Sequence, residues 1–294
     1  KAMYETLSSF PKIFGPNRCY DTPLSEDSLT GYGIGLAISG FKPIHVHQRT
    51  DFLLLCCNQL INIAAKVKYL SNGKISCPFV VRAITGRSWG QGSQHSQSFH
   101  SMFASIPGLR VLTPSTPQDV FNSYLNVFKD KIPTIIIEHR MLYKTKSRIR
   151  RLDNVPTVTK ISSGEDITLC SISHMTLEVQ KVTEALEKRG IFCDHFSIVD
   201  HSTLDTNTIF KSVNKTKKLL IITRGSKGAI SINGDDVCEI GIKKNLNIVD
   251  LTGAGDLFAA GYLHGYINNF SQQECLEKGT EMSSKIIQKI GARI

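Results

Sequence analysis

The sequence lacks the features of a membrane protein and of a secreted, disulfide-rich protein. No apolar run in its 294 residues approaches the roughly 20 residues of a membrane helix. Its start, Lys1-Ala2-Met3-Tyr4, has neither an initiator methionine at position 1 nor the apolar core of a signal peptide. None of the eight cysteines has the C-x-x-C spacing of a zinc or redox site. We therefore expect a cytoplasmic protein with reduced thiols and no membrane partner, and a fragment whose first elements are missing.

The composition is that of an ordinary globular protein with an excess of basic residues. At 41% hydrophobic, the chain can bury the core of one or two domains. The formal charge of +10 raises the alternative of a nucleic-acid partner, but the basic residues lie in short clusters such as 144–151, without interleaved aromatic residues or a recognisable binding motif. We interpret the charge as attraction to anionic substrates or to an acidic partner surface, and we do not expect a nucleic-acid ligand.

The first half of the chain has the pattern of an α/β domain. Over residues 31–138, short apolar runs alternate with helical patterns, which predicts a mostly parallel sheet. Residues 78–82 and 134–138 are predicted to be buried strands. Between them, a helix should run from Pro117 to about Phe128, with Thr116 as its N-cap.

A second α/β unit is predicted after an exposed linker at residues 144–155. Residues 167–171 and 191–198 have strand character, and Leu177, Val182 and Leu186 recur on one face of a helix between them. Near Ile222 the pattern changes, because glycines break the apolar runs and a helix follows Gly255.

Two glycine-rich segments are candidates for ligand contact. Residues 21–26, Asp-Thr-Pro-Leu-Ser-Glu, lead into Gly31-Tyr32-Gly33-Ile34-Gly35, where small residues permit close approach of another backbone or a flat ligand. Alone, this pattern more often serves packing, and Glu26 more often begins a helix. The loop 86–98 contains the only tryptophan, Trp89, and ends with His95-Ser96-Gln97. Glycine-rich loops serve active sites, although a lone histidine is usually structural.

The order of several segments carries a specific resemblance. The segments are Phe14-Gly15-Pro16, residues 21–26, residues 43–52, Asn62-Ile63-Ala64-Ala65-Lys66, residues 94–98, Ile106-Pro107-Gly108-Leu109, residues 114–117 and Glu138-His139-Arg140. Over residues 12 to about 143 they resemble the β-subunits of the decarboxylase component of pyruvate and branched-chain 2-oxoacid dehydrogenases. The resemblance implies a transketolase-like pyrimidine-binding domain, followed by a truncated second α/β domain.

The resemblance also implies a cofactor, thiamine diphosphate, and the residues that contact it. Glu26 is the carboxyl group that shares a proton with the cofactor's pyrimidine ring and so promotes the tautomer that activates it. Leu24, Gln48 and Phe52 line the pyrimidine pocket, although leucine and phenylalanine are more often core residues. His95 faces the substrate, where it donates a proton or holds the carboxylate.

The strand before Gln48 departs from the family pattern at one position and carries an alternation of basic residues that the resemblance does not explain. Val46 stands where many relatives carry an acid, which leaves the polarity of the pocket there open. His45, His47 and Arg49 alternate on a strand opposite Gln48, and we interpret them as an interface or a solvent face.

The chain lacks the other half of the cofactor site. The family binds the diphosphate and Mg²⁺ through a Gly-Asp-Gly…Asn motif of an α-subunit, and this sequence contains no such motif. The resemblance therefore implies an α-subunit partner in a heterotetramer. A lipoyl-bearing acyltransferase or another acyl acceptor would take the product. The sequence identifies no metal ligand of its own.

The C-terminal part carries a second resemblance. Residues 223–229 and 250–261 resemble ribokinase-like (PfkB-type) sugar and nucleoside kinases. By this resemblance, the amides of Gly253, Ala254 and Gly255 stabilise the transferring phosphoryl group of ATP, and Asp256 takes a proton from the acceptor hydroxyl. A helix cap that happens to have this sequence is the alternative. The half of a kinase that supplies the sugar site and lid is missing, so we expect no complete kinase.

Three functions stay open from the sequence. The first is the β-subunit of a 2-oxoacid dehydrogenase, the second is a sugar or nucleoside kinase, and the third is a non-catalytic chimera of two truncated modules, whether a real fusion or an artefact of gene prediction or assembly. The predicted segments are a pyrimidine-binding domain at 1–143, a linker at 144–155, the start of a transketolase C-terminal-like domain at 156–222 and a ribokinase-like fragment at 223–294, with the join near 219–224.

Overall fold

The chain divides into two compact units. The computed structural model describes residues 6–86, 90–216, 219–223, 227–250 and 253–289. Unit 1 contains residues 1–161, 170–184 and 195–205, and unit 2 contains residues 162–169, 185–194 and 206–294. Within the described ranges, no helix has the length and apolar character needed to span a membrane.

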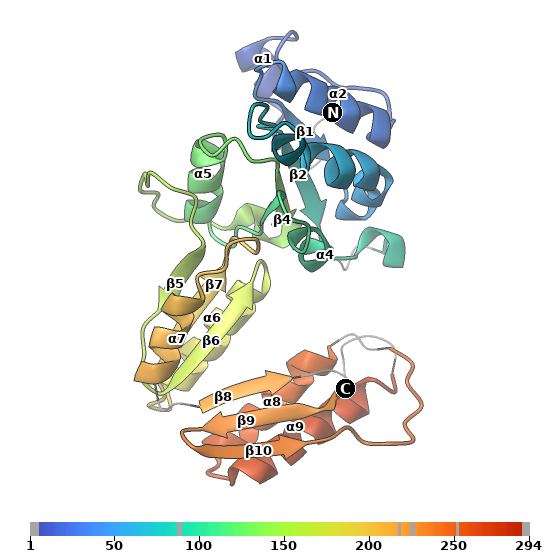
Figure 1. The fold of residues 1–294 in the computed structure, drawn as a ribbon. Helices are drawn as coiled ribbons and strands as arrows, with labels where there is room; N and C mark the ends of the chain where they lie inside the picture. The colour runs from blue at the N-terminus through green and yellow to red at the C-terminus, as the bar shows by residue number, and fades with distance from the viewer. Residues whose placement is uncertain (1–5, 87–89, 217–218, 224–226, 251–252, 290–294) are drawn as a thin grey trace. The chain divides into compact units, whose positions relative to one another are not determined.

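Unit 1 is built on a four-stranded sheet with the order β1-β2-β4-β3 (Figure 1). All three strand pairs are parallel, as the alternation of apolar runs and helical patterns predicts. Strand β2 begins two residues after Pro78, which has no N–H to donate to a ladder. The strands are β1 (Ile44–His47), β2 (Val80–Thr85), β3 (Arg110–Leu112) and β4 (Thr134–His139).

Helix α2 (Glu26–Ile38) packs against the sheet through one of its glycines. A Cβ at Gly33 would lie 2.5 Å from Cε2 of Phe79, so only glycine permits this approach. Gly31 and Gly35 have no such close contact. The small-residue pattern therefore serves packing at Gly33.

Helix α5 (Pro117–Asn126) begins as predicted and ends two residues earlier than predicted. Thr116 and Asp119 form a capping box, in which the Thr116 hydroxyl accepts from the Asp119 backbone N–H and the Asp119 carboxylate accepts from that of Thr116. The remaining helices of this part are α1 (Phe10–Phe14), η2 (Thr50–Cys56), η3 (Asn58–Ala64), α3 (Val67–Leu70), η4 (Ser93–His95), α4 (His100–Ala104) and η5 (Arg140–Lys144).

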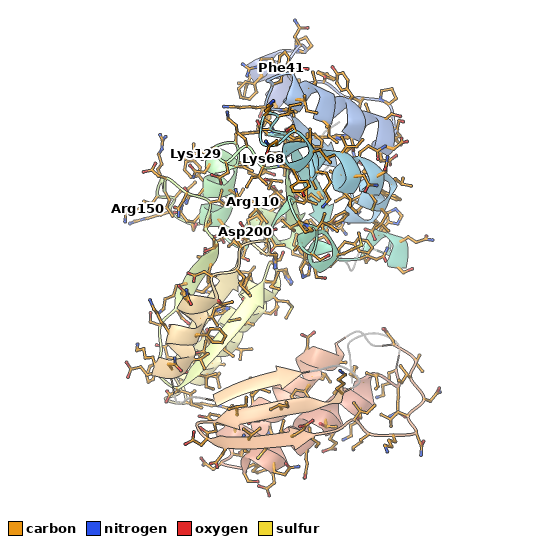
Figure 2. The ribbon with its side chains drawn as sticks, viewed as in Figure 1. Phe41, Lys68, Arg110, Lys129, Arg150 and Asp200 are labelled. Atoms are coloured by element: carbon orange, nitrogen blue, oxygen red, sulfur yellow. The ribbon has the colours of Figure 1, made fainter. Side chains whose placement is uncertain are left out.

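From residue 145 onward the predicted linker has no regular secondary structure, and it is bound to helix α5 and to the residues that follow this helix. The backbone N–H of Arg150 donates to Oε1 of Gln118 (2.6 Å), and Lys129 Nζ donates to the Asp153 carbonyl (2.6 Å). Figure 2 labels Arg150 and Lys129 at this helix.

Two ion pairs of Arg110 fix the start of β3 in unit 1. Arg110 lies 3.3 Å from Asp200 and 2.7 Å from Asp130 (Figure 2). Asp200 follows β7, so this pair joins two segments that are far apart in the sequence.

The middle of the chain forms a second, three-stranded sheet with the order β5-β7-β6. The predicted strands and the helix between them are present, although β7 begins two residues after Ile191. The elements are β5 (Val158–Ser162), β6 (Ile167–Ile172), α6 (Met175–Glu187), β7 (Cys193–Ile198) and α7 (Thr206–Lys215).

The C-terminal part of unit 2 is an antiparallel sheet with two helices. The sheet has the order β10-β9-β8, and α8 packs closely against α9, where a Cβ at Gly261 would lie 2.6 Å from the Lys278 carbonyl oxygen. The hydroxyls of Tyr262 and Ser231 are hydrogen-bonded (2.6 Å) inside the core. The elements are β8 (Leu219–Thr223), β9 (Ala229–Asn233), β10 (Asp236–Ile240), α8 (Ala254–Ile267) and α9 (Gln272–Ile286).

Candidate functional site

Five elements of unit 1 come together around the carboxyl ends of strands β1 and β2. Strand β1 ends at His47 and β2 ends at Thr85, and the segments 48–52 and 86–98 leave the sheet from these ends. Helices α2 and η2 pack against each other, and η2 packs against η4. Open parallel sheets bind ligands at this edge. The predicted residues Glu26, Gln48, Phe52 and His95 lie on these elements.

Glu26 is the first residue of α2 and is partly buried. Among the residues that the structure describes, none forms a hydrogen bond to its carboxylate. Burial lowers the pKa of His45 on β1, and the negative charge of Glu26 opposes that shift. The carboxylate is therefore close enough to influence His45 of β1, and no described residue occupies it, so it can accept a hydrogen bond from a ligand.

The expectation of a solvent face for the 45/47/49 alternation is wrong for His47 and Arg49 within this chain. His47 is 4% exposed and Arg49 is 3% exposed. The Thr30 hydroxyl of α2 lies 3.5 Å from Nε2 of His47, and the Cys56 thiol of η2 lies 3.9 Å from it. Burial lowers the pKa of His47 to about 3, so this imidazole is neutral. The two helices cover the strand face that a two-residue alternation assigns to solvent.

The predicted pyrimidine-pocket residues lie at the surface of this chain. Leu24 is 92% exposed, Phe52 is 36% exposed, and Gln48 is also exposed. The alternative that Leu24 and Phe52 are core residues is therefore wrong. The Phe52 ring meets the His95 ring edge to face, with centroids 5.3 Å apart. Exposed apolar side chains such as these are available to a ligand or to a second subunit.

His95 ends the short helix η4 and has a free buried nitrogen. Its Nδ1 is buried without a hydrogen-bond partner in the described part of the chain. Trp89, in the same loop, lies outside the described residues. His95 can therefore exchange a proton or bind a ligand through a nitrogen that no described residue occupies.

The loop that carries His95 is fastened by residues that the sequence analysis did not identify. Oδ1 of the buried Asp51 accepts hydrogen bonds from the backbone N–H (3.1 Å) and the side-chain amide (2.9 Å) of Gln97. The Thr85 hydroxyl donates to the Gln97 carbonyl (3.1 Å). The sequence signal is an acid at position 51, directly before the apolar run 52–55.

The kinase-like residues belong to unit 2. Gly253 caps α8 in the left-handed region (φ 82°), Ala254 and Gly255 follow, and Asp256 is exposed in the first turn. Residues 251–252 of the motif lie outside the described residues. The helix N-terminus thus presents backbone N–H groups beside an accessible carboxylate.

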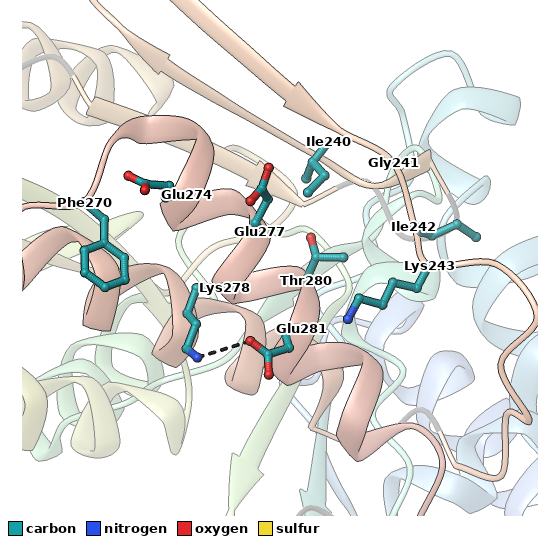
Figure 3. Close-up of a pocket in the computed structure, with 10 residues that line it drawn as sticks. All are labelled: Ile240, Gly241, Ile242, Lys243, Phe270, Glu274, Glu277, Lys278, Thr280 and Glu281. Carbon is teal, nitrogen blue, oxygen red and sulfur yellow. Dashed lines mark hydrogen bonds and ion pairs between the residues drawn. The ribbon is translucent and has the colours of Figure 1, made fainter.

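A groove of about 660 Å³ in unit 2 does not include these residues (Figure 3). It lies between the end of β10 and α9, and Lys278 pairs there with Glu281 (3.1 Å). Throughout the described ranges, no group of three or more His, Cys, Asp or Glu side chains is arranged to hold a metal ion.

Comparisons with known proteins identify both parts of the chain. Residues 4–146 match the family "Transketolase, pyrimidine binding domain". The 2-oxoisovalerate dehydrogenase subunit beta of Bacillus subtilis is 36% identical over 229 residues, which are 76% of this chain and 70% of that protein. This chain belongs to the family of 2-oxoacid dehydrogenase β-subunits. The pyruvate dehydrogenase E1 component subunit beta of Pisum sativum is 32% identical over 258 residues, which are 85% of this chain and 71% of that protein.

A solved structure has the same fold. "Split gene transketolase, inactive beta4 tetramer" superposes with a TM-score of 0.61 at 18% identity, over 74% of this chain and 68% of that chain. This likeness confirms the transketolase-like α/β fold.

Residues 182–294 of this chain match the family "pfkB family carbohydrate kinase", which confirms the second resemblance. The match begins within α6, before the position at which the sequence pattern changes. The place of the join near 219–224 stays a prediction.

Proposed function

We propose that this chain supplies the pyrimidine side of a thiamine-diphosphate site and acts in the decarboxylation of a 2-oxoacid with transfer of the acyl group. The observation that carries the proposal is the carboxylate of Glu26, the first residue of α2, which lies near His45 of β1 and has no hydrogen bond to any described residue. A carboxylate with no partner of its own is available for the pyrimidine ring nitrogen.

The chemistry of the surrounding side chains fits the pyrimidine part of the cofactor. Glu26 would hold a proton at the ring nitrogen, Phe52 would cover the ring with its aromatic face, and Gln48 would bind through its amide. Thiamine diphosphate, when bound, supplies the carbanion chemistry of the reaction. His95, through the ring nitrogen that no described residue occupies, would move a proton at the substrate.

The same site supports the proposal of a partner. Leu24 and Phe52 are exposed at its edge, so a second surface has to exclude water from the reaction. We assign that surface, together with the diphosphate and Mg²⁺ ligands, to an α-subunit in a heterotetramer. We further propose a lipoyl-bearing acyltransferase as the acyl acceptor.

The experiment that tests this function is reconstitution with an α-subunit that carries the Gly-Asp-Gly…Asn motif. Purified complex would be assayed for CO₂ release from pyruvate and from branched-chain 2-oxoacids, with and without thiamine diphosphate and Mg²⁺. Cofactor-dependent release supports the proposal. No release from any 2-oxoacid by a complex that binds the cofactor would contradict it.

A second candidate function is ATP-dependent phosphorylation of a sugar or nucleoside. The observation that favours it is the start of α8, where Gly253 and the following amides lie beside the accessible Asp256. We place it second because Asp256 is exposed and does not line the groove of its own unit.

A further inference from the structure

Arg49, which the functions above do not use, lies at the carboxyl edge of the parallel sheet. It stands between β1 and η2, and its side chain is 3% exposed. Its Nη1 donates to the carbonyl of Gly86 (3.3 Å), the residue that follows β2. The guanidinium therefore reaches from the end of one strand to the end of the next, along the edge where such sheets bind ligands.

The other terminal nitrogen of Arg49 is unsatisfied. Nη2 is buried without a hydrogen-bond partner, and no residue that the structure describes forms an ion pair with this side chain. A buried charge without a counter-charge is strongly destabilising. The same guanidinium bound to a carboxylate is held by charge-assisted hydrogen bonds, which are the strongest of their kind. The free nitrogen therefore points to an anionic group that the described chain does not supply.

The neighbours of Arg49 indicate where that anion comes from. Arg49 holds the first residue of the loop 86–97, and Asp51 holds its last residue, Gln97. This loop carries His95, whose buried Nδ1 is also without a partner among the described residues. Two unsatisfied nitrogens therefore belong to one arrangement: Nη2 of Arg49, which is bonded to the start of this loop, and Nδ1 of His95 within the loop, whose ring contacts Phe52 of the proposed pyrimidine pocket.

We propose that Arg49 binds a carboxylate of the 2-oxoacid substrate. This inference rests on the proposed function, because every 2-oxoacid carries a carboxylate at C1 and some carry a second one. It assigns charge recognition to Arg49 and leaves the proton to His95. Arg49 is a substrate-binding residue in this scheme and takes no part in proton transfer, since a guanidinium stays protonated.

The test measures binding without catalysis. The complex of the full chain with its α-subunit, free of thiamine diphosphate, would be titrated calorimetrically with pyruvate, 2-oxoglutarate and the uncharged ester methyl pyruvate. Arg49→Met should raise the Kd of the acids about tenfold or more, and leave that of the ester unchanged. Arg49→Lys should lie between the two, because it keeps the charge without the planar fork. Arg148→Met, at an exposed arginine of the linker, is the matched control.

The titrations distinguish binding of the C1 carboxylate from binding of the distal carboxylate of 2-oxoglutarate. An equal loss for pyruvate and 2-oxoglutarate assigns Arg49 to the C1 carboxylate, and a loss confined to 2-oxoglutarate assigns it to the distal one. Unchanged Kd values for both acids, or an equal loss for the ester, would overturn the proposal. Unchanged acid binding with weaker assembly of the complex would overturn it too, and would assign Arg49 to a partner's carboxylate.

A measurement on the full chain alone separates binding from structure. Removal of a buried, unpaired charge should raise the melting temperature in Arg49→Met, whereas Arg148→Met should leave it unchanged. A drop in melting temperature in both Arg49 variants would overturn the proposal, because it would make Arg49 a structural residue. Failure of the proposed function is recognised separately, as Arg49-dependent binding of the acids without CO₂ release in the loaded complex.

Discussion

The carboxylate of Asp51 holds Gln97 through two hydrogen bonds, one to its backbone N–H (3.1 Å) and one to its side-chain amide (2.9 Å). Asp51 is buried on η2, and Gln97 lies two residues after His95. The position of His95 therefore depends on a residue that is distant in sequence and does not itself contact the proposed cofactor.

Removal of this carboxylate should loosen the loop. We expect Asp51→Ala to increase amide hydrogen exchange over residues 93–97 and to lower the free energy of unfolding by about 1–3 kcal/mol, the net contribution of hydrogen bonds to a charged acceptor. Asp51→Asn keeps an acceptor oxygen and should retain most of the protection. Exchange rates in Asp51→Ala equal to those of the unsubstituted protein would contradict the role of Asp51 as a fastening residue.

Glu26→Gln should abolish decarboxylation in the reconstituted complex. An amide has the shape of the carboxyl group but cannot share a proton with the pyrimidine nitrogen, so the rate of CO₂ release should fall at least about a hundredfold. Asp27→Asn is the matched control, because Asp27 is the next residue of the same helical turn and is exposed. Near-normal turnover by Glu26→Gln would remove the basis of the assignment.

Two buried histidines should make the chain less stable in mild acid. Burial lowers the pKa of His47 to about 3 and that of His195 to about 4. In the unfolded chain both titrate near pH 6.5. As the pH falls below about 6.5, the unfolded state takes up protons that the folded state does not, so the free energy of unfolding decreases by up to about 1.4 kcal/mol per pH unit for each histidine. Above pH 7 these histidines make no pH-dependent contribution.

Urea denaturation at pH 7, 6 and 5 measures this slope. His195→Gln should reduce the dependence of the free energy of unfolding on pH by the contribution of one histidine. His264→Gln, at an exposed histidine of α8, should leave this dependence unchanged. A slope that is the same in His195→Gln and in the unsubstituted chain would show that His195 is not neutral in the folded state.

The full chain alone should show no ATP-dependent phosphorylation of ribose, fructose or adenosine. Phosphoryl transfer requires both substrates to be positioned and the developing charge to be neutralised, and Asp256 lies on an exposed helical turn. Calorimetric titration with ATP and an assay of ADP release check this, and Asp256→Asn should leave CO₂ release by the complex unchanged. Turnover that Asp256→Asn removes would make the kinase the leading function.

Local signals predicted the elements well where their cause is local. Thr116 and Pro117 begin α5 because the capping box and the fixed φ of proline need only neighbouring residues. The apolar runs that became β2 and β4 are buried on both faces, as parallel strands are. The strand limits were less accurate, because a ladder begins where a partner strand offers acceptors, and Val80 donates to the Pro43 carbonyl (3.1 Å).

In the candidate site, too, the sequence indicated residues in local motifs and missed those whose environment depends on distant segments. Glu26 and His95 were predicted from motifs and stay predictions. The burial of His47 and Arg49 was missed because helices α2 and η2 cover β1, and the alternation of residues along one strand carries no information about such a cover. Asp51 was missed because its partner Gln97 lies 46 residues further along the chain.

The sequence by itself determined the α/β class, the family of the pyrimidine-binding part and the kinase-like character of the C-terminal part, since these follow from ordered motifs and apolar periodicity. Only the tertiary structure decided which polar groups are buried, which are paired and which are left free for a ligand. The physical reason is that Arg49, Asp51 and Nδ1 of His95 are desolvated by segments that are distant in sequence and pack together in space. The residues next to them in the sequence do not determine this packing.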